Sequence, residues 1–221
     1  MFRLLLLSAV LAVALGQTKF CCTPDQWEGY LGEIAGSVVS GTTHLITGNI
    51  SISYDYTNTK MATSSYLVID GKNQDVTVIM DYQKKMMYTI IGTQCTTSQL
   101  TGDMMKLCVP DNAMPSGKFT YGAGSTTLDA MAYLVPAGPD STVYVTTTVG
   151  NPCVPIGEVL YGTPNKIPTV QTMGYYNISP GIKDPQIFNP PSSCSGQKFL
   201  KPAPVLTNFL MKHMHAKVTK H

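Results

Sequence analysis

Arginine is almost missing from this chain of 221 residues, since Arg3 is the only arginine among fifteen basic residues. Bidentate clamps on phosphate or carboxylate groups are mostly made by arginine, so such sites are not expected. Charged residues make up only 13% of the chain and the formal net charge is +2, whereas nucleic-acid-binding proteins usually carry a dense basic face. A hydrophobic content of 43% with so little charge also excludes a disordered chain.

Long apolar runs are lacking after the first sixteen residues, and none reaches the roughly 20 residues that a membrane-spanning helix needs. Residues 1–16 predict a secretory signal peptide, because Arg3 precedes an apolar stretch over residues 4–15. Cleavage is expected after Gly16, or otherwise after Ala14. The chain is therefore predicted to be secreted and extracellular.

Catalytic signatures are lacking as well: there is no G-x-S-x-G elbow, no H-E-x-x-H and no Walker loop. His44 is the only histidine before the C-terminal segment, and we interpret it as a partly exposed structural residue. Asp25, Glu28 and Glu33 lie close in sequence, but the polar face of a short helix over residues 26–34 explains them better than paired catalytic carboxylates. The chain is predicted to be non-enzymatic, with no catalytic or cofactor-binding residue.

Metal-binding patterns are weak. Asp70 and Asp75 enclose a polar stretch, but Gly71 comes too early for an EF-hand loop. His213, His215 and His221 stand near the chain end, where such a spacing is poor evidence of a site. No metal ligand is assigned.

The six cysteines are even in number, which in an oxidising compartment predicts three disulfides, and none of them forms a C-x-x-C motif. Because a bond between adjacent cysteines is strained, Cys21 and Cys22 should each take a distant partner. Spacing alone leaves the pairing open among Cys21, Cys22, Cys95, Cys108, Cys153 and Cys194.

Alternation of apolar and polar residues dominates the middle of the chain and predicts strands. Turn signals such as Asp70-Gly71 separate these segments. The pattern predicts a mainly β protein, either a curved antiparallel sheet or half-barrel, or a β-sandwich. The expected strands cover residues 44–56, 65–69, 75–82, 86–91, 128–135, 142–149 and 170–178.

Methionine is frequent in this strand-rich region, and its flexible thioether suits both an adaptable apolar binding surface and an ordinary core. Both interpretations stay open for Met80, Met86, Met87, Met104, Met105, Met114 and Met131.

Two N-x-S/T sequons predict glycosylation at Asn49 and Asn177. Asn49 falls on the polar face of its expected strand, whereas Pro180 after the second sequon disfavours Asn177. From residue 185 to the end there are five lysines, three histidines and no acid. We predict one domain over residues 17–221 that ends in a basic helix or tail from about residue 198.

Three segments together resemble the ependymin-related proteins. They are Phe20-Cys21-Cys22-Thr23-Pro24 with Trp27-Glu28-Gly29, then Cys153-Val154-Pro155-Ile156, and finally residues 181–191 (GIKDPQIFNPP) followed by Cys194. The resemblance covers nearly the whole chain after the signal peptide. It implies a secreted, disulfide-bonded glycoprotein with the curved sheet of bacterial lipoprotein carriers, covered by one or two short helices.

The resemblance also implies pairings and functions. Cys21 or Cys22 would pair with Cys153, and Cys95 with Cys194, which leaves Cys108 for the remaining N-terminal cysteine. It implies a non-enzymatic protein that binds a hydrophobic ligand of lipid type and that forms a homodimer. Calcium-linked cell-matrix adhesion is a further property of the family, although the small positive charge here departs from its acidic members. The alternative function is a structural component of an extracellular matrix, including that of a calcified shell.

Overall fold

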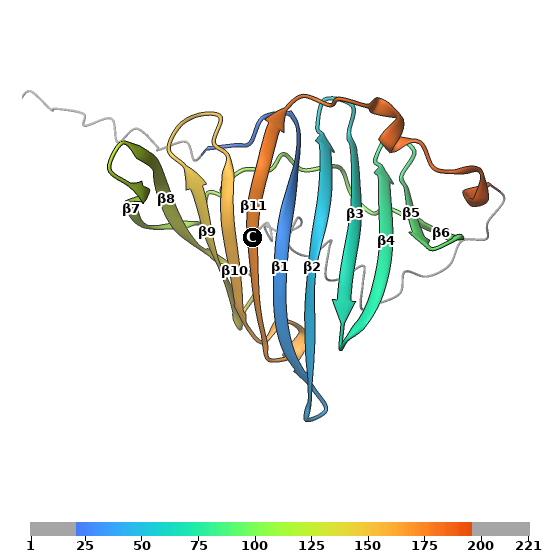
Figure 1. The fold of residues 1–221 in the computed structure, drawn as a ribbon, viewed down its shortest axis with the longest axis horizontal. Helices are drawn as coiled ribbons and strands as arrows, with labels where there is room; N and C mark the ends of the chain where they lie inside the picture. Colours follow the sequence, from blue (N-terminus) through green and yellow to red (C-terminus); the bar gives the residue numbers. More distant parts are fainter. Residues whose placement is uncertain (1–20, 196–221) are drawn as a thin grey trace, which may run out of the picture.

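Residues 21–195 are described by the structure, which is a computed structural model. The predicted signal peptide and the basic segment from about residue 198 therefore lie outside the described residues. The described chain forms one open antiparallel sheet (Figure 1). Its strands are β1 Gln26–Val39, β2 Thr42–Asp55, β3 Lys60–Ile69, β4 Lys72–Asp81, β5 Met86–Ile91, β6 Gln94–Gln99, β7 Met114–Ala123, β8 Thr126–Pro136, β9 Ser141–Thr148, β10 Pro155–Gly162 and β11 Thr169–Pro180.

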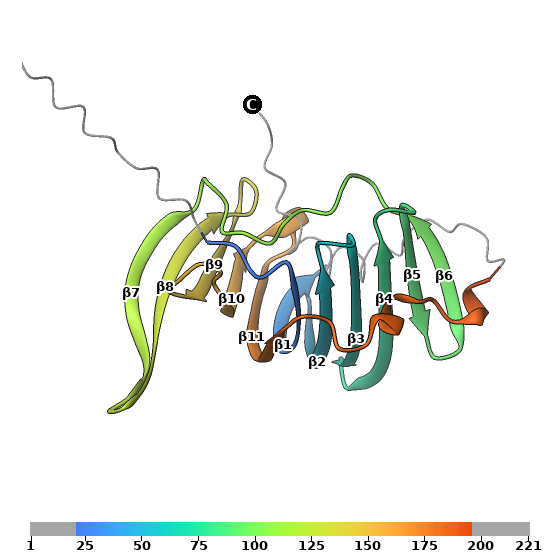
Figure 2. The ribbon, with the colours of Figure 1, turned by 90° about the horizontal axis from the view of Figure 1, so that it is seen from above.

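The sheet consists of two meanders that meet in its middle. The strand order is β6-β5-β4-β3-β2-β1-β11-β10-β9-β8-β7, so the first and last strands of the chain are neighbours. After β6 the chain crosses to the opposite edge through residues 100–113, which we call the crossover segment. Figure 2 shows the bowed sheet, with this segment on the concave side and the segment after β11 on the convex side. The prediction of a curved antiparallel sheet is confirmed, and the sandwich alternative is wrong.

Two-residue turns set the register of several hairpins. Ile69 pairs with Lys72, so only Asp70 and Gly71 connect β3 to β4. Both turn residues have positive φ, 49° and 79°, as a type I′ turn requires. The Asp70 carboxylate also accepts a hydrogen bond from the Leu45 amide at 2.9 Å and lies 2.7 Å from Nδ1 of His44. Asp70 and His44 therefore stabilise a turn, as the structural interpretation of His44 expected.

The prediction of a short helix over residues 26–34 is wrong, because this segment belongs to β1. Trp27 and Leu31 lie on the buried face of the strand, whereas Tyr30 and Ile34 are exposed on the other face. Apolar residues on both faces here stand at positions i, i+3, i+4 and i+7, which is the spacing of an amphipathic helix. All seven expected strands exist, while β6, β7 and β10 were not expected.

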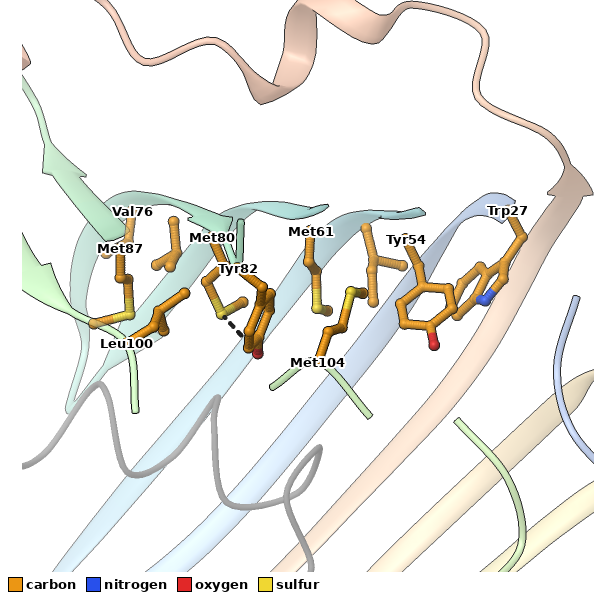
Figure 3. Packing of buried hydrophobic residues seen from close by; sticks show 11 residues of the cluster. Trp27, Tyr54, Met61, Val76, Met80, Tyr82, Met87, Leu100 and Met104 are labelled. Atoms are coloured by element: carbon orange, nitrogen blue, oxygen red, sulfur yellow. Dashed lines mark hydrogen bonds between the residues drawn. The ribbon is translucent and has the colours of Figure 1, made fainter. Parts of the chain in front are cut away.

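The crossover segment closes one part of the concave face. Side chains from β1 to β5 pack there against Leu100 and Met104 (Figure 3). We call this group the crossover cluster. Met80, Met87 and Met104 are buried in the crossover cluster, so the ordinary-core interpretation holds for these three. Of the other methionines, Met86 and Met131 are partly buried, and Met105 and Met114 are exposed. The members of the crossover cluster are Trp27, Ile52, Tyr54, Met61, Val76, Val78, Met80, Tyr82, Met87, Leu100 and Met104.

Short 3₁₀ helices take the place of the covering helices that were expected. In the described chain these are η1 Pro164–Lys166, η2 Pro185–Phe188 and η3 Ser192–Cys194, and none is long and apolar enough to cross a membrane. Asp184 caps η2 by accepting a hydrogen bond from the Gln186 amide at 2.9 Å. Phe188 is 4% exposed and packs against Ala62 and Ile79, so η2 covers part of the convex face.

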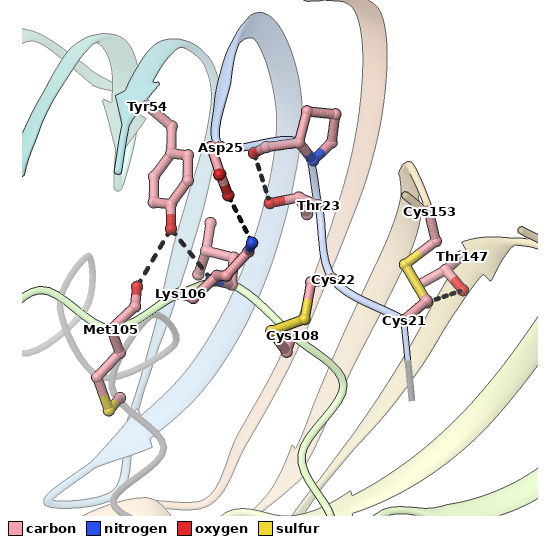
Figure 4. The surroundings of a disulfide bond; sticks show 12 residues. Cys21, Cys22, Thr23, Asp25, Tyr54, Met105, Lys106, Cys108, Thr147 and Cys153 are labelled. Carbon is pink, nitrogen blue, oxygen red and sulfur yellow. Dashed lines mark hydrogen bonds and ion pairs between the residues drawn. A yellow bond between two sulfur atoms is a disulfide. The ribbon is translucent and has the colours of Figure 1, made fainter. Parts of the chain in front are cut away.

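Three disulfides cross-link the sheet and its connecting segments. They are Cys21–Cys153, Cys22–Cys108 and Cys95–Cys194. The pairs are those that the resemblance implied, with Cys21 as the partner of Cys153. Figure 4 shows that the first two bonds join the N-terminal segment to both the crossover segment and the chain just before β10. The third joins η3 to the edge strand β6.

The Tyr54 hydroxyl anchors the crossover segment to the sheet. It donates a hydrogen bond to the Met105 carbonyl at 3.2 Å and accepts one from the Leu107 amide at 3.1 Å (Figure 4). Burial raises the pKa of Tyr54 to about 12, so the hydroxyl stays protonated. Tyr54→Phe should lower the free energy of unfolding by about 1–3 kcal/mol, because two backbone groups lose their partner.

Urea unfolding of Tyr54→Phe measures this effect. Tyr56→Phe is the matched control, since the Tyr56 ring stacks on Tyr54 but its hydroxyl makes no hydrogen bond to the described residues. Equal stability of the two variants would contradict an anchoring role for the Tyr54 hydroxyl.

Candidate functional site

A second apolar cluster lies on the concave face, at the junction of the two meanders. It consists of buried Leu31 from β1, Ile50 from β2, Leu67 from β3 and Met173 from β11. Partly buried Ile69 and Tyr175 pack against it. All of these residues come from strands, and we call the group the floor cluster. It differs in this respect from the crossover cluster, which includes side chains of the crossover segment.

Two carboxyl groups flank the floor cluster. Glu33 on β1 and Glu158 on β10 both pair with Met173, which lies between them on β11, so all three side chains share the concave face. Glu33 is 4% exposed and accepts a hydrogen bond from Nε2 of Gln171 at 2.7 Å. Glu158 is partly buried and accepts one from the Tyr175 hydroxyl at 3.0 Å.

Burial makes both carboxyl groups weaker acids. It raises the pKa of Glu33 from 4.5 to about 7, although the Gln171 hydrogen bond acts in the opposite direction. It also raises the pKa of Glu158, against the smaller effect of the Tyr175 hydrogen bond. The pKa of Tyr175 is well above 10, first because of burial and then because of the neighbouring Glu158 charge.

Several buried polar atoms on the same face lack a partner. The Thr63 and Ser65 hydroxyls and the Trp27 indole nitrogen are buried and make no hydrogen bond to the described residues. Thr63 pairs with Ile52, and Ser65 pairs with Ile50 of the floor cluster. A buried polar group without a partner costs stability, so each such group calls for an explanation. A bound molecule that contacts the concave face would provide one.

The acidic residues that the sequence placed together are separated by the fold. The Asp25 carboxylate lies 2.6 Å from the Lys106 ammonium at the crossover segment. Glu28 accepts a hydrogen bond from Ser53 at 3.4 Å on the convex face, whereas Glu33 is on the concave face. Over residues 21–195, no three His, Cys, Asp or Glu side chains lie close enough together to hold a metal ion.

Both predicted glycosylation sites are exposed. Asn49 is on the convex face of β2, where its Oδ1 accepts a hydrogen bond from the Tyr176 hydroxyl at 3.0 Å. A shallow open depression surrounds it, lined among others by Gly32, Ile34 and Tyr66. Asn177 lies in β11 with a positive φ of 52°.

Glu33, Glu158 and Gln171 were not recognised as site residues from the sequence. Each is a polar residue at an inward position of a strand: Glu33 alternates with the outward Tyr30 and Ile34 on β1, and Gln171 is 1% exposed. An inward polar residue breaks the alternation, and the break itself is the signal. It becomes visible only when the strand and its inner face are known.

The sequence profile of the Ependymin family matches residues 70–194. The chain belongs to the ependymin family. It is 31% identical over 193 residues to ependymin-related protein 1 of Haliotis asinina, covering 80% of this chain and 91% of the relative. Ependymin-related protein 2 of the same organism is 28% identical over 206 residues, covering 87% and 98%. A solved structure of an uncharacterized conserved protein from Thermus thermophilus aligns with a TM-score of 0.47 at 8% identity, covering 78% of this chain and 88% of that one.

Proposed function

We propose that this ependymin-family protein is a secreted, non-enzymatic carrier that holds a hydrophobic ligand, of lipid type, against the concave face of its sheet. The observation that carries the proposal is the floor cluster, whose members among residues 21–195 all come from strands. An apolar molecule held against these side chains would gain roughly 25 cal/mol for each Å² of its own apolar surface that is removed from water. The three disulfides support export, because such bonds persist in oxidising compartments.

Titration with the uncharged fluorescent probe N-phenyl-1-naphthylamine tests the carrier function. We expect saturable binding, weakened about tenfold by Met173→Ala, because that change removes apolar contact from the floor cluster. Val170→Ala is the matched control: Val170 is on the same strand but on the convex face, 57% exposed, and its truncation should leave binding unchanged. A folded protein that never saturates with the probe would contradict the proposal.

We also propose that Asn49 carries an N-linked glycan. Its side chain is exposed, and the hydrogen bond from Tyr176 uses the oxygen and leaves the amide nitrogen, which would carry the sugar, without a partner among the described residues. Glycosidase treatment should reduce the mass of the secreted protein, and this shift should disappear in Asn49→Gln. Asn177→Gln should retain it, because Pro180 follows that sequon; an unchanged shift in Asn49→Gln would count against the assignment.

A structural role in an extracellular matrix is the second candidate, and the convex face favours it. Ile34, Leu45 and Val170 are 61%, 53% and 57% exposed there, on the adjacent strands β1, β2 and β11. Gly36 pairs with both Leu45 and Val170, so these side chains lie on either side of it. Such a patch would bind a neighbouring molecule, including a second copy in a homodimer. This candidate expects retention in the insoluble matrix and no saturable probe binding.

A further inference from the structure

We propose that the ligand's polar end is a hydrogen-bond donor, an alcohol or an amine, and not a carboxylate or a phosphate. The inference rests on the proposed carrier function and specifies the chemical class of its ligand. It follows from the kinds of polar group that the described part of the concave face presents around the floor cluster.

The ionisable groups around the floor cluster are acidic. Glu33 and Glu158 stand on either side of Met173. Tyr175 next to them donates a hydrogen bond to Glu158 and is uncharged, since its pKa is raised well above 10. Among the strand lysines of the described chain, Lys60 pairs with Asp55 and Asp81 on the convex face. Lys118 pairs with Met131 and so shares the concave side, but it is exposed on the edge strand β7. Lys72 pairs with Ile69 at the rim of the concave face, where it is exposed, and β2 and β3 separate its strand β4 from the β1 strand of Glu33. Lys106 of the crossover segment lies 2.6 Å from Asp25.

Above the Glu33 pKa of about 7, where this carboxyl group is ionised, an anionic head group next to it would be destabilised. Like charges repel strongly where water is excluded, and a buried anion without a cationic partner costs several kcal/mol. An amine has the opposite charge to an ionised carboxyl group, and an alcohol adds no charge. Both therefore avoid the repulsion that a fatty-acid carboxylate or a phosphate would meet.

The hydrogen-bonding capacity of the face also fits a donor. In each carboxyl group Oε1 accepts a hydrogen bond, whereas Oε2 has no partner among the described residues. The Ser65 hydroxyl, opposite Ile50 of the floor cluster, is 3% exposed and also has none, and it can accept as well as donate. The Thr63 hydroxyl, 4% exposed and likewise unpaired, lies opposite Ile52 of the crossover cluster. A hydroxyl or ammonium group on a ligand would satisfy acceptors of this kind. The Trp27 indole, an unpaired donor, belongs instead to the crossover cluster.

Three probes with the same hydrocarbon chain test the inference: oleyl alcohol, oleylamine and oleic acid, each displacing N-phenyl-1-naphthylamine at pH 7.5. The alcohol and the amine should displace it at concentrations at least about tenfold lower than oleic acid, a difference of about 1.4 kcal/mol. Displacement by oleic acid at the same or a lower concentration overturns the inference. So does probe binding that none of the three reduces, although the carrier function then stands. Failure of the probe itself to bind rejects the carrier function.

The double variant Glu33→Gln/Glu158→Gln identifies the residues responsible. It should raise the affinity for oleic acid about tenfold, because the repelling charges are removed. The difference in affinity between oleyl alcohol and oleic acid should therefore become smaller. Glu28→Gln on the convex face is the matched control and should keep the wild-type difference in affinity between oleyl alcohol and oleic acid. If this difference in affinity is unchanged in the double variant, the two carboxyl groups have only a structural role. Circular dichroism confirms that each variant is folded before the titration.

Discussion

Removing the Cys21–Cys153 disulfide, by replacing both cysteines with serine, should lower the free energy of unfolding by about 4 kcal/mol. The bond joins residues 132 positions apart. The adjacent Cys22–Cys108 bond, however, already holds the N-terminal segment at the crossover segment. With that bond intact, the loop that is opened runs over about 45 residues from Cys108 to Cys153, and closing a loop of that length accounts for the expected loss.

Urea unfolding under non-reducing conditions, followed by the fluorescence of Trp27, measures this loss. The corresponding Cys95→Ser/Cys194→Ser variant, at the opposite edge of the sheet, is the comparison. The other two bonds shorten the path between Cys95 and Cys194, so the loop that is opened has a similar effective length. The free energy of unfolding should therefore fall by a similar amount. A loss below about 1 kcal/mol for the Cys21/Cys153 pair would contradict the chain-entropy account. It would mean that hydrogen bonds such as Val109 amide to Cys21 carbonyl, 3.0 Å, hold the segment without the bond.

Glu33→Gln should stabilise the protein at pH 8 by up to about 3 kcal/mol. Burial raises the pKa of the Glu33 carboxyl from 4.5 to about 7. The folded protein therefore holds this proton over a pH range in which the unfolded chain has released it. The stability linked to the proton is complete below pH 4.5 and is lost as the pH rises through about 7. Glutamine carries no charge at any pH, and its amide oxygen still accepts the hydrogen bond from Gln171.

The free energy of unfolding measured from pH 4.5 to pH 8 tests this expectation. The variant and the wild type should converge at the acidic end and diverge as the pH rises. Glu158→Gln should change stability in the same direction, since burial also raises the pKa of Glu158. Glu28→Gln, on the convex face of the same strand, should follow the wild-type curve. A Glu33→Gln variant less stable than the wild type at pH 8 would show that the Glu33 charge is stabilised by its surroundings.

Local signals predicted a large part of the fold. The hairpin between β3 and β4 was readable because Asp70-Gly71 is a turn sequence and the flanking residues alternate. By contrast, the apolar spacing in β1 is that of a helix, although the segment is a strand. Strand β7 is exposed at nearly every position, so burial imposes no apolar alternation on it. Strands at such an edge, or with apolar residues on both faces, lack the pattern that identifies a strand.

The candidate site was much less predictable. Glu33 and Glu158 are 125 residues apart in the chain and become neighbours of Met173 only because β11 inserts between β1 and β10. The sequence offered Glu33 only as part of an acidic group with Asp25 and Glu28, and the pleat of β1 separates Glu28 from it. Met173, the methionine between the two carboxyl groups, lay outside the methionine-rich stretch that the sequence emphasised.

Taken alone, the sequence determined properties that depend on neighbouring residues or on residue type: mainly β structure, several turns, an even set of cysteines and membership of the ependymin family. Tertiary structure decided which faces of the strands are buried, which strands join the two meanders, and where the crossover segment closes the concave face. The physical reason is that register and burial arise from contacts between distant parts of the chain. A glutamate has the same formula on either face of a strand, and only the packed sheet makes one of them a buried acid beside an apolar floor.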